Sequence, residues 1–309
     1  MGNIAMEKIG GLRVSRLCLG ANVFGWTADR DTSFAILDGY VAAGGNFIDT
    51  ADSYMFHAPG NSGGESETII GEWMESRGNR DDVVVATKVG SLPTRPGLSA
   101  ANIAAACDDS LRRLRTDRID LYWAHKDDPG TAQEETSGAF GALVRAGKVR
   151  ELGASNFSAD RMRSAAAVST GYVALQPHYN LMERAEFEST LAPLLTEQGI
   201  GCVPYYGLAR GFLTGKYRPG GADIESVRAE GARAYLDERG ERVLEALDAI
   251  SAARDVPVGA VALAWLAAQP DVAAPIASAR TSEQLEALLP VLELQLTADE
   301  LAALTAASD

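Results

Sequence analysis

The sequence predicts an α/β protein: one (β/α)8 TIM barrel over residues 1–309, with an N-terminal β-hairpin and a C-terminal helical extension. Short apolar segments alternate with segments of helical periodicity, which indicates parallel strands covered by helices. This strand–helix unit occurs eight times, and eight units close into a barrel. The length of 309 residues suits such a domain. The alternative, a doubly wound open sheet, favours a GxGxxG turn after its first strand, and the sequence contains no such motif.

The elements are expected in a regular order. A hairpin within residues 8–20 turns at Gly10-Gly11 and leads into the first barrel strand at 17–20. The later strands are short apolar runs, which we place at 46–49, 83–88, 119–125, 149–154, 172–176, 200–205 and 272–276. The helices between them are expected after residue 32 as far as 44, and at 65–77, 99–114, 131–147, 158–168 and 183–198.

The C-terminal part departs from this simple alternation. A long connection from 207 to about 237 precedes two helices, at 236–253 and 258–268, and helices at 281–289 and after Thr297 close the chain. Capping boxes are predicted at two helix starts, Thr131 with Glu134 and Thr281 with Gln284. In such a box, the two side chains bond the backbone amides that the first helical turn leaves free.

Charge and cysteine content limit the classes of partner and compartment. The formal net charge of −14 argues against nucleic acid and anionic membrane surfaces as partners. Cys18, Cys107 and Cys202 form no CxxC pair, and we interpret them as buried free thiols in a reducing compartment. Residues 1–8 contain no apolar signal-peptide core, and the longest apolar stretch, 256–268, is too short to span a bilayer. We therefore expect a cytoplasmic protein; its oligomeric state is not indicated.

Three neighbouring strand ends carry the side chains with the clearest chemistry. In a barrel of this kind the active site lies at the carboxyl ends of the strands. These ends offer Asp49, followed by Tyr54 in the next loop, then Lys88 and His125. A buried lysine is costly unless it is paired, and by topology Asp49 is the nearest partner for Lys88. A lysine beside Tyr54 would lower the pKa of the phenol and make it a proton donor or acceptor.

Structural roles are the alternative for each of these residues. An Asp–Lys pair at a barrel rim, a packed tyrosine and a hydrogen-bonded histidine are all common, but their convergence on one barrel mouth favours catalysis. His125 is placed to orient a substrate oxygen or to share the proton. A metal site at His57 and His178 is disfavoured because no HxH pair follows the first strand.

The last strand end predicts an anion site. Arg280 directly precedes the helix that begins at Thr281, and a guanidinium beside free helix amides suits a phosphate group. It would give this acidic chain a local basic pocket. The alternative is that Arg280 only forms a salt bridge with an acid such as Glu283.

Seven motifs together resemble the aldo-keto reductase superfamily along nearly the whole chain. They are NFIDTADSY at 46–54, ATK at 86–88, DLYWAH at 120–125, GKVR at 147–150, GASNF at 153–157, QPHYN at 176–180 and LARGFLTGKY at 208–217. The resemblance is nearer to the bacterial and potassium-channel β-subunit-like branches than to the aldose-reductase branch.

This resemblance implies a carbonyl reductase that uses NADPH/NADP+ and converts an aldehyde or ketone to an alcohol. The implied catalytic tetrad is Asp49, Tyr54, Lys88 and His125: Tyr54 protonates the carbonyl oxygen as nicotinamide C4 delivers hydride, Lys88 lowers the tyrosine pKa, and His125 orients the carbonyl. The implied cofactor contacts are Ser155, Asn156 and Gln176 to the carboxamide, Tyr205 stacked on the nicotinamide, Leu208, Gly211 and Lys216 along the pyrophosphate, and Ser278, Arg280 and Gln284 at the adenosine and its 2′-phosphate.

Two departures from the family pattern, two expectations about the substrate pocket and two alternative functions complete the prediction. Ala287-Leu288 and Tyr206-Gly207 stand where many relatives have Glu-Asn and Ser-Pro, which affects the adenine contacts and the pyrophosphate loop. Trp26 is expected to form a wall of the substrate pocket, and loop 56–64 to lie over its mouth. The alternative functions are a Schiff-base aldolase that uses Lys88 and an NADP(H)-binding regulatory subunit of the same fold.

Overall fold

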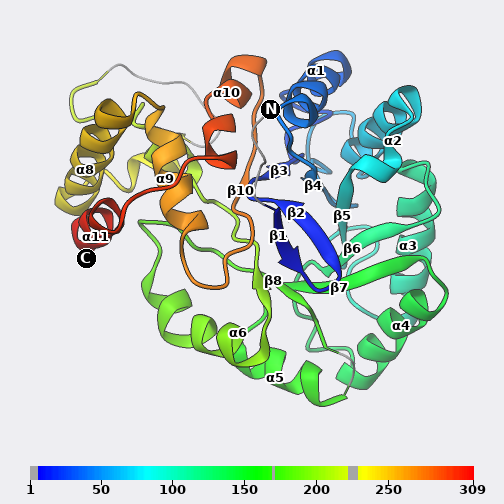
Figure 1. The fold of residues 1–309 in the computed structure, drawn as a ribbon. Helices are drawn as coiled ribbons and strands as arrows, with labels where there is room; N and C mark the ends of the chain where they lie inside the picture. The colour runs from blue at the N-terminus through cyan, green and yellow to red at the C-terminus, as the bar shows by residue number, and fades with distance from the viewer. Residues whose placement is uncertain (1–5, 169–170, 222–228) are drawn as a thin grey trace.

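Eight parallel strands form a curved sheet that the helices surround (Figure 1). The computed structural model describes residues 6–168, 171–221 and 229–309. The strand order in the sheet is β10-β3-β4-β5-β6-β7-β8-β9. The two edges meet through backbone hydrogen bonds of Cys202, which donates to Asp271 at 2.7 Å and accepts from Ala273 at 2.8 Å. The predicted α/β barrel is therefore confirmed.

The bounds of the elements are these. The strands are β1 Met6–Ile9, β2 Leu12–Ser15, β3 Cys18–Gly20, β4 Phe47–Asp49, β5 Val84–Val89, β6 Ile119–Ala124, β7 Val149–Ser155, β8 Ala174–Gln176, β9 Gly201–Cys202 and β10 Ile276–Ala277. The α-helices are α1 Arg30–Ala42, α2 Glu65–Arg77, α3 Ala100–Arg113, α4 Gln133–Arg145, α5 Ala159–Val168, α6 Ala192–Gln198, α7 Ala229–Arg233, α8 Glu238–Arg254, α9 Val258–Ala267, α10 Ser282–Glu286 and α11 Ala298–Ala307. Four further turns are η1 Arg80–Asp82, η2 Phe187–Leu191, η3 Ala209–Thr214 and η4 Leu289–Leu292.

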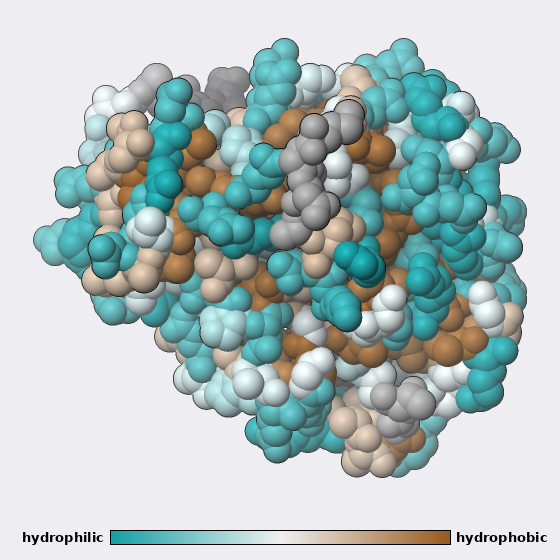
Figure 2. Space-filling view, viewed as in Figure 1, coloured by the Kyte–Doolittle hydropathy of each residue, from teal (hydrophilic) through white to brown (hydrophobic). Residues whose placement is uncertain are grey.

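The N-terminal hairpin, β1 and β2, closes the amino-terminal end of the barrel (Figure 1). Its side chains Ile9, Leu12 and Val14 are fully buried against the inward-facing apolar residues of the strands, Phe47 and Trp123 among them. Burial of apolar surface stabilises the folded state by about 25 cal/mol for each Å² removed from water. Hydrophilic residues cover most of the same face of the molecule (Figure 2). The hairpin therefore leaves the carboxyl ends of the strands as the open end.

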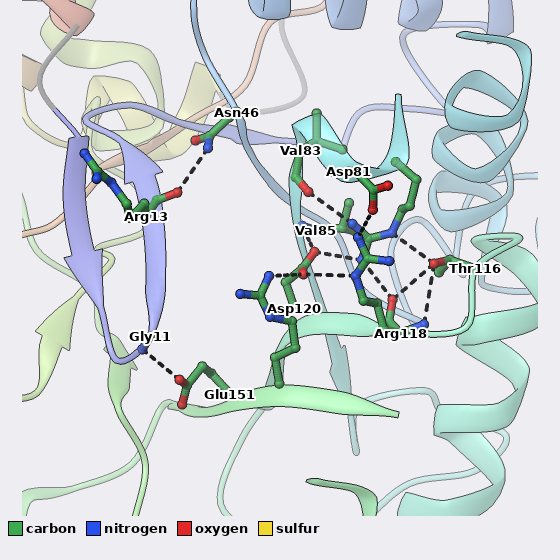
Figure 3. Close-up of polar contacts among 12 residues, drawn as sticks. Gly11, Arg13, Asn46, Asp81, Val83, Val85, Thr116, Arg118, Asp120 and Glu151 are labelled. Carbon is green, nitrogen blue, oxygen red and sulfur yellow. Dashed lines mark hydrogen bonds and ion pairs between the residues drawn. The ribbon is translucent and has the colours of Figure 1, made fainter. Parts of the chain in front are cut away.

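A polar cluster fastens the same end (Figure 3). Glu151 of β7 accepts a hydrogen bond of 2.7 Å from the backbone amide of Gly11 at the hairpin turn. Asp120 of β6 is buried and accepts hydrogen bonds from Arg80 at 2.7 Å and from Arg150 at 2.9 Å. These side chains connect the hairpin with strands β5 to β7 at the amino-terminal end of the barrel.

The predicted helix at 183–198 is present from residue 185, but part of its first half is not a regular α-helix. Residues Phe187–Leu191 form a π-turn, η2, and α6 begins only at Ala192. Ser189 and Thr190 donate their hydroxyl groups to carbonyls four residues back, at 2.6 and 2.7 Å, and compete there with the regular ladder. Pro193, which lacks an amide hydrogen, follows directly.

The capping boxes also differ from prediction. Thr131 does not cap α4, because its hydroxyl donates to the Asp128 carboxylate at 2.7 Å, a stronger acceptor. At α10 only half of the predicted box forms: Thr281 accepts from the Gln284 amide, but the Gln284 side chain bonds the Arg280 amide instead. A complete box stands at Thr297, where only a short helix was expected.

The C-terminal elements are shorter than predicted. Strand β10 lies at Ile276–Ala277, and Val272 forms only an isolated bridge with Cys202. The helix at 281–289 ends at Glu286 and continues as the 3-10 turn η4, which contains Pro290. The connection from 207 to 237 contains η3 and α7, and its residues 222–228 lie outside the described residues.

Two further sequence predictions concern the cysteines and possible membrane-spanning segments. Cys18, Cys107 and Cys202 are buried free thiols, as predicted. In the described part of the chain, no single helix is long and apolar enough to cross a bilayer, although α8 and α9, bent by 100° at their break, meet that length and composition together.

Candidate active site

Asp49, Lys88 and Tyr54 meet at the carboxyl ends of β4 and β5. The two strands pair in parallel with Asp49 opposite Ala86, so Lys88 lies one pleat further towards the open end. The fully buried Lys88 ammonium donates to the Asp49 carboxylate, to the Thr50 carbonyl at 2.8 Å and to the Tyr54 hydroxyl at 2.7 Å. These three acceptors use all three of its donors.

The pKa of Tyr54 moves in the direction opposite to the prediction. Burial raises it well above its ordinary value, and the Asp49 carboxylate, which accepts the Tyr54 hydroxyl at 3.2 Å, raises it further. Burial also lowers the pKa of Lys88, while Asp49 opposes that change. The predicted lowering of the Tyr54 pKa by Lys88 is therefore wrong, because burial and the carboxylate prevail. The resident form of Tyr54 is a neutral phenol, which is a proton donor.

His125 follows β6 and faces the same centre. Burial lowers its pKa to about 3, with contributions from Lys88 and Lys126, so the ring is neutral near pH 7. Its Nδ1 lies 3.3 Å from the Ser53 hydroxyl, and its ring packs edge-on against Tyr54 with centroids 6.0 Å apart. Ser53 was not predicted, although it directly precedes Tyr54. A neutral imidazole can donate or accept one hydrogen bond at the nitrogen that Ser53 does not contact.

A cavity of about 590 Å³ opens above these residues. Asp49 and Lys88 lie beneath its floor, and the predicted contact residues form its walls. They are Trp26, Tyr54, His125, Ser155, Asn156, Gln176, Tyr205, Leu208, Gly211, Lys216, Ser278, Arg280 and Gln284. Cavities of this size hold cofactors and small molecules.

Charge in the cavity contrasts with the charge of the chain. Arg210, Lys216 and Arg280 line it, and none of the described lining residues is an aspartate or a glutamate. On a chain with a net charge of −14, this is a local basic pocket. Arg280 takes part in no ion pair among the described residues, so the alternative pairing with Glu283 does not form.

A hydrogen-bonded chain runs under one wall of the cavity. The Tyr205 hydroxyl donates to the side-chain Oδ1 of Asn156 at 2.9 Å, and the side-chain Nδ2 of Asn156 donates to the backbone carbonyl of His125 at 3.0 Å. Gln176 reaches across the barrel and donates to the second carboxylate oxygen of Asp49 at 3.1 Å. The sequence did not indicate this link, since it depends on how the closed barrel brings β8 opposite β4.

The cavity lining includes two residues, Asn22 and Arg210, to which the sequence analysis gave no role. Ser278 donates to the Asn22 side chain at 2.6 Å, and Asn22, Tyr206 and Arg210 all line the cavity. Ala287 and Leu288, noted only as departures, make part of the wall apolar. Arg210 lies inside the motif at 208–217, and its charge was the available signal.

The loops after β3 and β4 bound the side of the cavity that Trp26 lines. Trp26 lines the cavity and contacts His57 edge-on, with ring centroids 6.4 Å apart. In the loop at 56–64, Asn61 donates to the Gly25 carbonyl at 3.0 Å and so joins the two loops. No group of three or more His, Cys, Asp or Glu side chains among the described residues is arranged to hold a metal.

Comparison with known proteins places this geometry in context. The model of the Aldo/keto reductase family matches residues 16–309. The chain is 37% identical to "Uncharacterized oxidoreductase YrpG" of Bacillus subtilis, over 93% of this chain and 90% of that protein. It is 34% identical to "Norsolorinic acid reductase stcV" of Emericella nidulans, over 96% and 79% of the two chains. It is also 34% identical to a "Probable voltage-gated potassium channel subunit beta" of Oryza sativa, over 92% and 89%.

Proposed function

This chain belongs to the aldo/keto reductase family and is an oxidoreductase, and on that premise we propose that it reduces an aldehyde or ketone to an alcohol with NADPH. One observation carries the proposal: the neutral phenol of Tyr54 lies at the wall of a basic cavity and is held between an ammonium and a carboxylate. The proposed partner is a small carbonyl compound, and the proposed location is cytoplasmic.

Each residue of the centre has a distinct part in the proposed reaction. Tyr54 turns its hydroxyl hydrogen from Asp49 to the carbonyl oxygen and donates the proton. Lys88, 2.7 Å away, stabilises the phenolate that this transfer leaves, and Asp49 holds Lys88 in place. His125, which is neutral, donates a hydrogen bond that orients the carbonyl. General acid catalysis of this kind contributes about 10²–10⁴ in rate.

The cavity fits the proposed cofactor. Its volume and two of its cations, Lys216 and Arg280, with no acidic residue among the described lining side chains, suit a ligand with several phosphate groups. When bound, NADPH supplies the hydride. Lys216 and Arg280 are the proposed phosphate ligands. The carboxamide and adenosine contacts are proposed for Ser155, Asn156 and Gln176, and for Ser278 and Gln284.

Two alternatives differ in their support. The similarity to a protein named as a potassium channel subunit favours an NADP(H)-binding regulatory subunit as the second candidate. A Schiff-base aldolase is disfavoured, because the Lys88 nitrogen has all its hydrogens bonded and pairs with a carboxylate. Such a nitrogen has no free lone pair for attack.

A panel of aldehydes and ketones, assayed by NADPH oxidation, tests the reductase proposal. We expect turnover that depends on NADPH, and in Arg280→Met a KM for NADPH raised about 10- to 100-fold with little change in the KM for NADH. Equal KM values for the two cofactors in the unmodified protein would contradict the phosphate role of Arg280. Tight NADPH binding without turnover of any carbonyl would favour the regulatory subunit.

A further inference from the structure

Arg210 is a cation in the cavity that the proposed cofactor contacts do not use. It lies in η3, within the connection that follows β9, and lines the same cavity as Tyr54 and His125. Its side chain is exposed, in contrast to the buried Lys88. The other two cations of the cavity, Lys216 and Arg280, are the proposed ligands of the cofactor phosphates. The third cation therefore needs a different explanation.

The surroundings of Arg210 hold its guanidinium in one place. Its Cζ lies 4.6 Å from the ring centre of Tyr206, a cation–π contact. Helix α7 packs against its stem, since a Cβ built on Gly231 would lie 2.7 Å from the Arg210 Cδ. Tyr206, Ala209 and Arg210 all have positive φ, of 55°, 45° and 59°. A positive φ is uncommon for non-glycine residues and costs backbone energy, so three in five residues mark a conformation that the surrounding contacts must hold.

Arg210 has a neutral hydrogen-bond partner, Tyr235, whose own hydroxyl donates to Glu183 at 2.8 Å, but Arg210 itself has no ion pair among the described residues. Arg80, Arg113 and Arg184, by contrast, all form ion pairs with carboxylates. The chain has 42 acidic and 28 basic residues, so acidic partners are abundant. An arginine without one, on a cavity wall free of described acids, is available to an anion.

Arg210 also lies on the side of the cavity where the reaction is proposed to occur. Tyr206, whose ring packs against the Arg210 guanidinium, directly follows Tyr205 in the sequence. The nicotinamide is proposed to stack on Tyr205. Tyr206 is close enough to Tyr54 to contribute to the raised pKa of that phenol. Tyr206 also packs edge-on against Tyr205, with ring centroids 5.2 Å apart, so the Tyr206–Arg210 pair lies beside the residue on which the nicotinamide is proposed to stack.

We propose that Arg210, supported by Tyr206, binds a carboxylate of the substrate. The substrate class is then an aldehyde or ketone that carries an acid group several bonds from its carbonyl carbon. The planar guanidinium can bind both oxygens of a carboxylate at once, while Tyr54 and His125 hold the carbonyl at the other end. This inference rests on the proposed reductase function.

The test compares para-carboxybenzaldehyde with its methyl ester, which has the same reacting group without the charge. With saturating NADPH, we expect kcat/KM of the unmodified protein to favour the acid by about tenfold or more. Arg210→Gln should lower kcat/KM for the acid about 10- to 100-fold, mainly through KM, and bring the acid-to-ester ratio close to one. Arg210→Lys keeps the positive charge but lacks the two parallel N–H donors of a guanidinium. It should restore part of the preference for the acid over the ester.

A matched control separates a local contact from a change in net charge. Arg242→Gln removes the same charge from the exposed face of α8, outside the cavity. The acid-to-ester ratio should stay at the value of the unmodified protein. A ratio that falls equally in both variants would show a long-range field effect and overturn the proposal.

The Kd values of NADPH and of benzoate separate failure of this inference from failure of the proposed function. If both aldehydes are reduced at equal rates, the assigned substrate class is wrong and the reductase stands. If Arg210→Gln raises the Kd for NADPH more than tenfold and slows both aldehydes alike, Arg210 binds cofactor and the proposal is wrong. If neither aldehyde is reduced, benzoate titrated into the NADP+ complex decides: binding that Arg210→Gln abolishes supports the anion site, and equal binding in both proteins overturns it.

Discussion

The barrel holds one buried, hydrogen-bonded aspartate at each end, and the two carboxylates have different kinds of partner. At the amino-terminal end, Asp120 accepts hydrogen bonds from Arg80, Arg150 and the backbone amide of Val85, at 2.7–2.9 Å (Figure 3). Guanidinium groups stay charged at any pH that the fold tolerates. This carboxylate is saturated, and no side chain around it is placed to release a proton.

At the carboxyl end, Asp49 is held by groups that can exchange protons. Its partners are Lys88, Tyr54 and Gln176, and the Tyr54 side chain faces the cavity. Burial pushes the pKa of Lys88 down and that of Tyr54 up. A buried charge alone is therefore not a sign of catalysis. The sign is a titratable partner with access to a cavity.

Tyr54→Phe should give the largest effect and separate the two ends most clearly. The ring and its packing remain, but the proton donor is lost, so kcat should fall about 10²- to 10⁴-fold. Steady-state kinetics with the best carbonyl substrate, beside thermal unfolding, measure both properties. Equal rates in the two proteins would remove Tyr54 from the reaction.

Asp120→Ala should have the reverse effect. It leaves Arg80 and Arg150 at the amino-terminal end of the barrel without their acceptor, and breaking a buried pair in this way costs about 3–5 kcal/mol. We expect that loss in the free energy of unfolding by urea, with kcat of the folded protein unchanged. Asp81→Ala is the control: Asp81 pairs with Arg118 but is 88% exposed, so its loss should cost about 1 kcal/mol or less. A large fall in kcat with Asp120→Ala would contradict the division of roles.

Gln176→Met tests whether the cross-barrel bond belongs to the catalytic end. It removes a hydrogen bond to a buried carboxylate, which should lower stability by about 1.5–3 kcal/mol and kcat by about tenfold. Gln133→Met is the control, because the Gln133 amide is buried without a hydrogen-bond partner among the described residues. That change should be neutral or stabilising. Equal losses in both variants would mean that Gln176 only fills space.

These residues also show what a sequence can and cannot predict. Asp49, Lys88 and His125 were predictable, because strand–helix alternation brings successive strand ends to one edge. The bond from Gln176 to Asp49 was not, since it depends on barrel closure. The Tyr54 pKa was predicted in the wrong direction, because the sequence shows neighbouring charges but not burial.

Loop side chains and local helix type mark the other limit. Arg210 was missed because its direction depends on positive φ angles in a loop rather than on a strand pattern. The π-turn at Phe187–Leu191 was missed because apolar periodicity does not register competing hydroxyl bonds. The strands of the barrel did not depend on such details, and the α/β fold class was predictable from alternation alone.

A third buried aspartate, Asp52, shows the case in which the partner is absent. It lies in the loop after β4, its side chain is buried, and neither of its carboxyl oxygens has a hydrogen-bond partner in the described structure. Burial, and then the Glu67 carboxylate, raise its pKa to about 7, against 3.8 in the unfolded chain. The folded state therefore holds a proton that the unfolded state releases between these pH values. The contribution of Asp52 to the free energy of unfolding therefore falls as the pH rises from about 4 to 7.

Asp52→Asn should remove that pH dependence, with the smallest effect of the series. The variant should be more stable than the unmodified protein at pH 7, because asparagine cannot ionise, whereas at that pH the unfolded chain has released the Asp52 proton that the folded state tends to keep. Near pH 4 the gain should vanish, since both proteins then carry a neutral side chain. Urea unfolding at the two pH values measures the difference. A variant less stable than the unmodified protein at pH 7 would show that the Asp52 carboxylate is charged and bound, and would place it with Asp49 and Asp120.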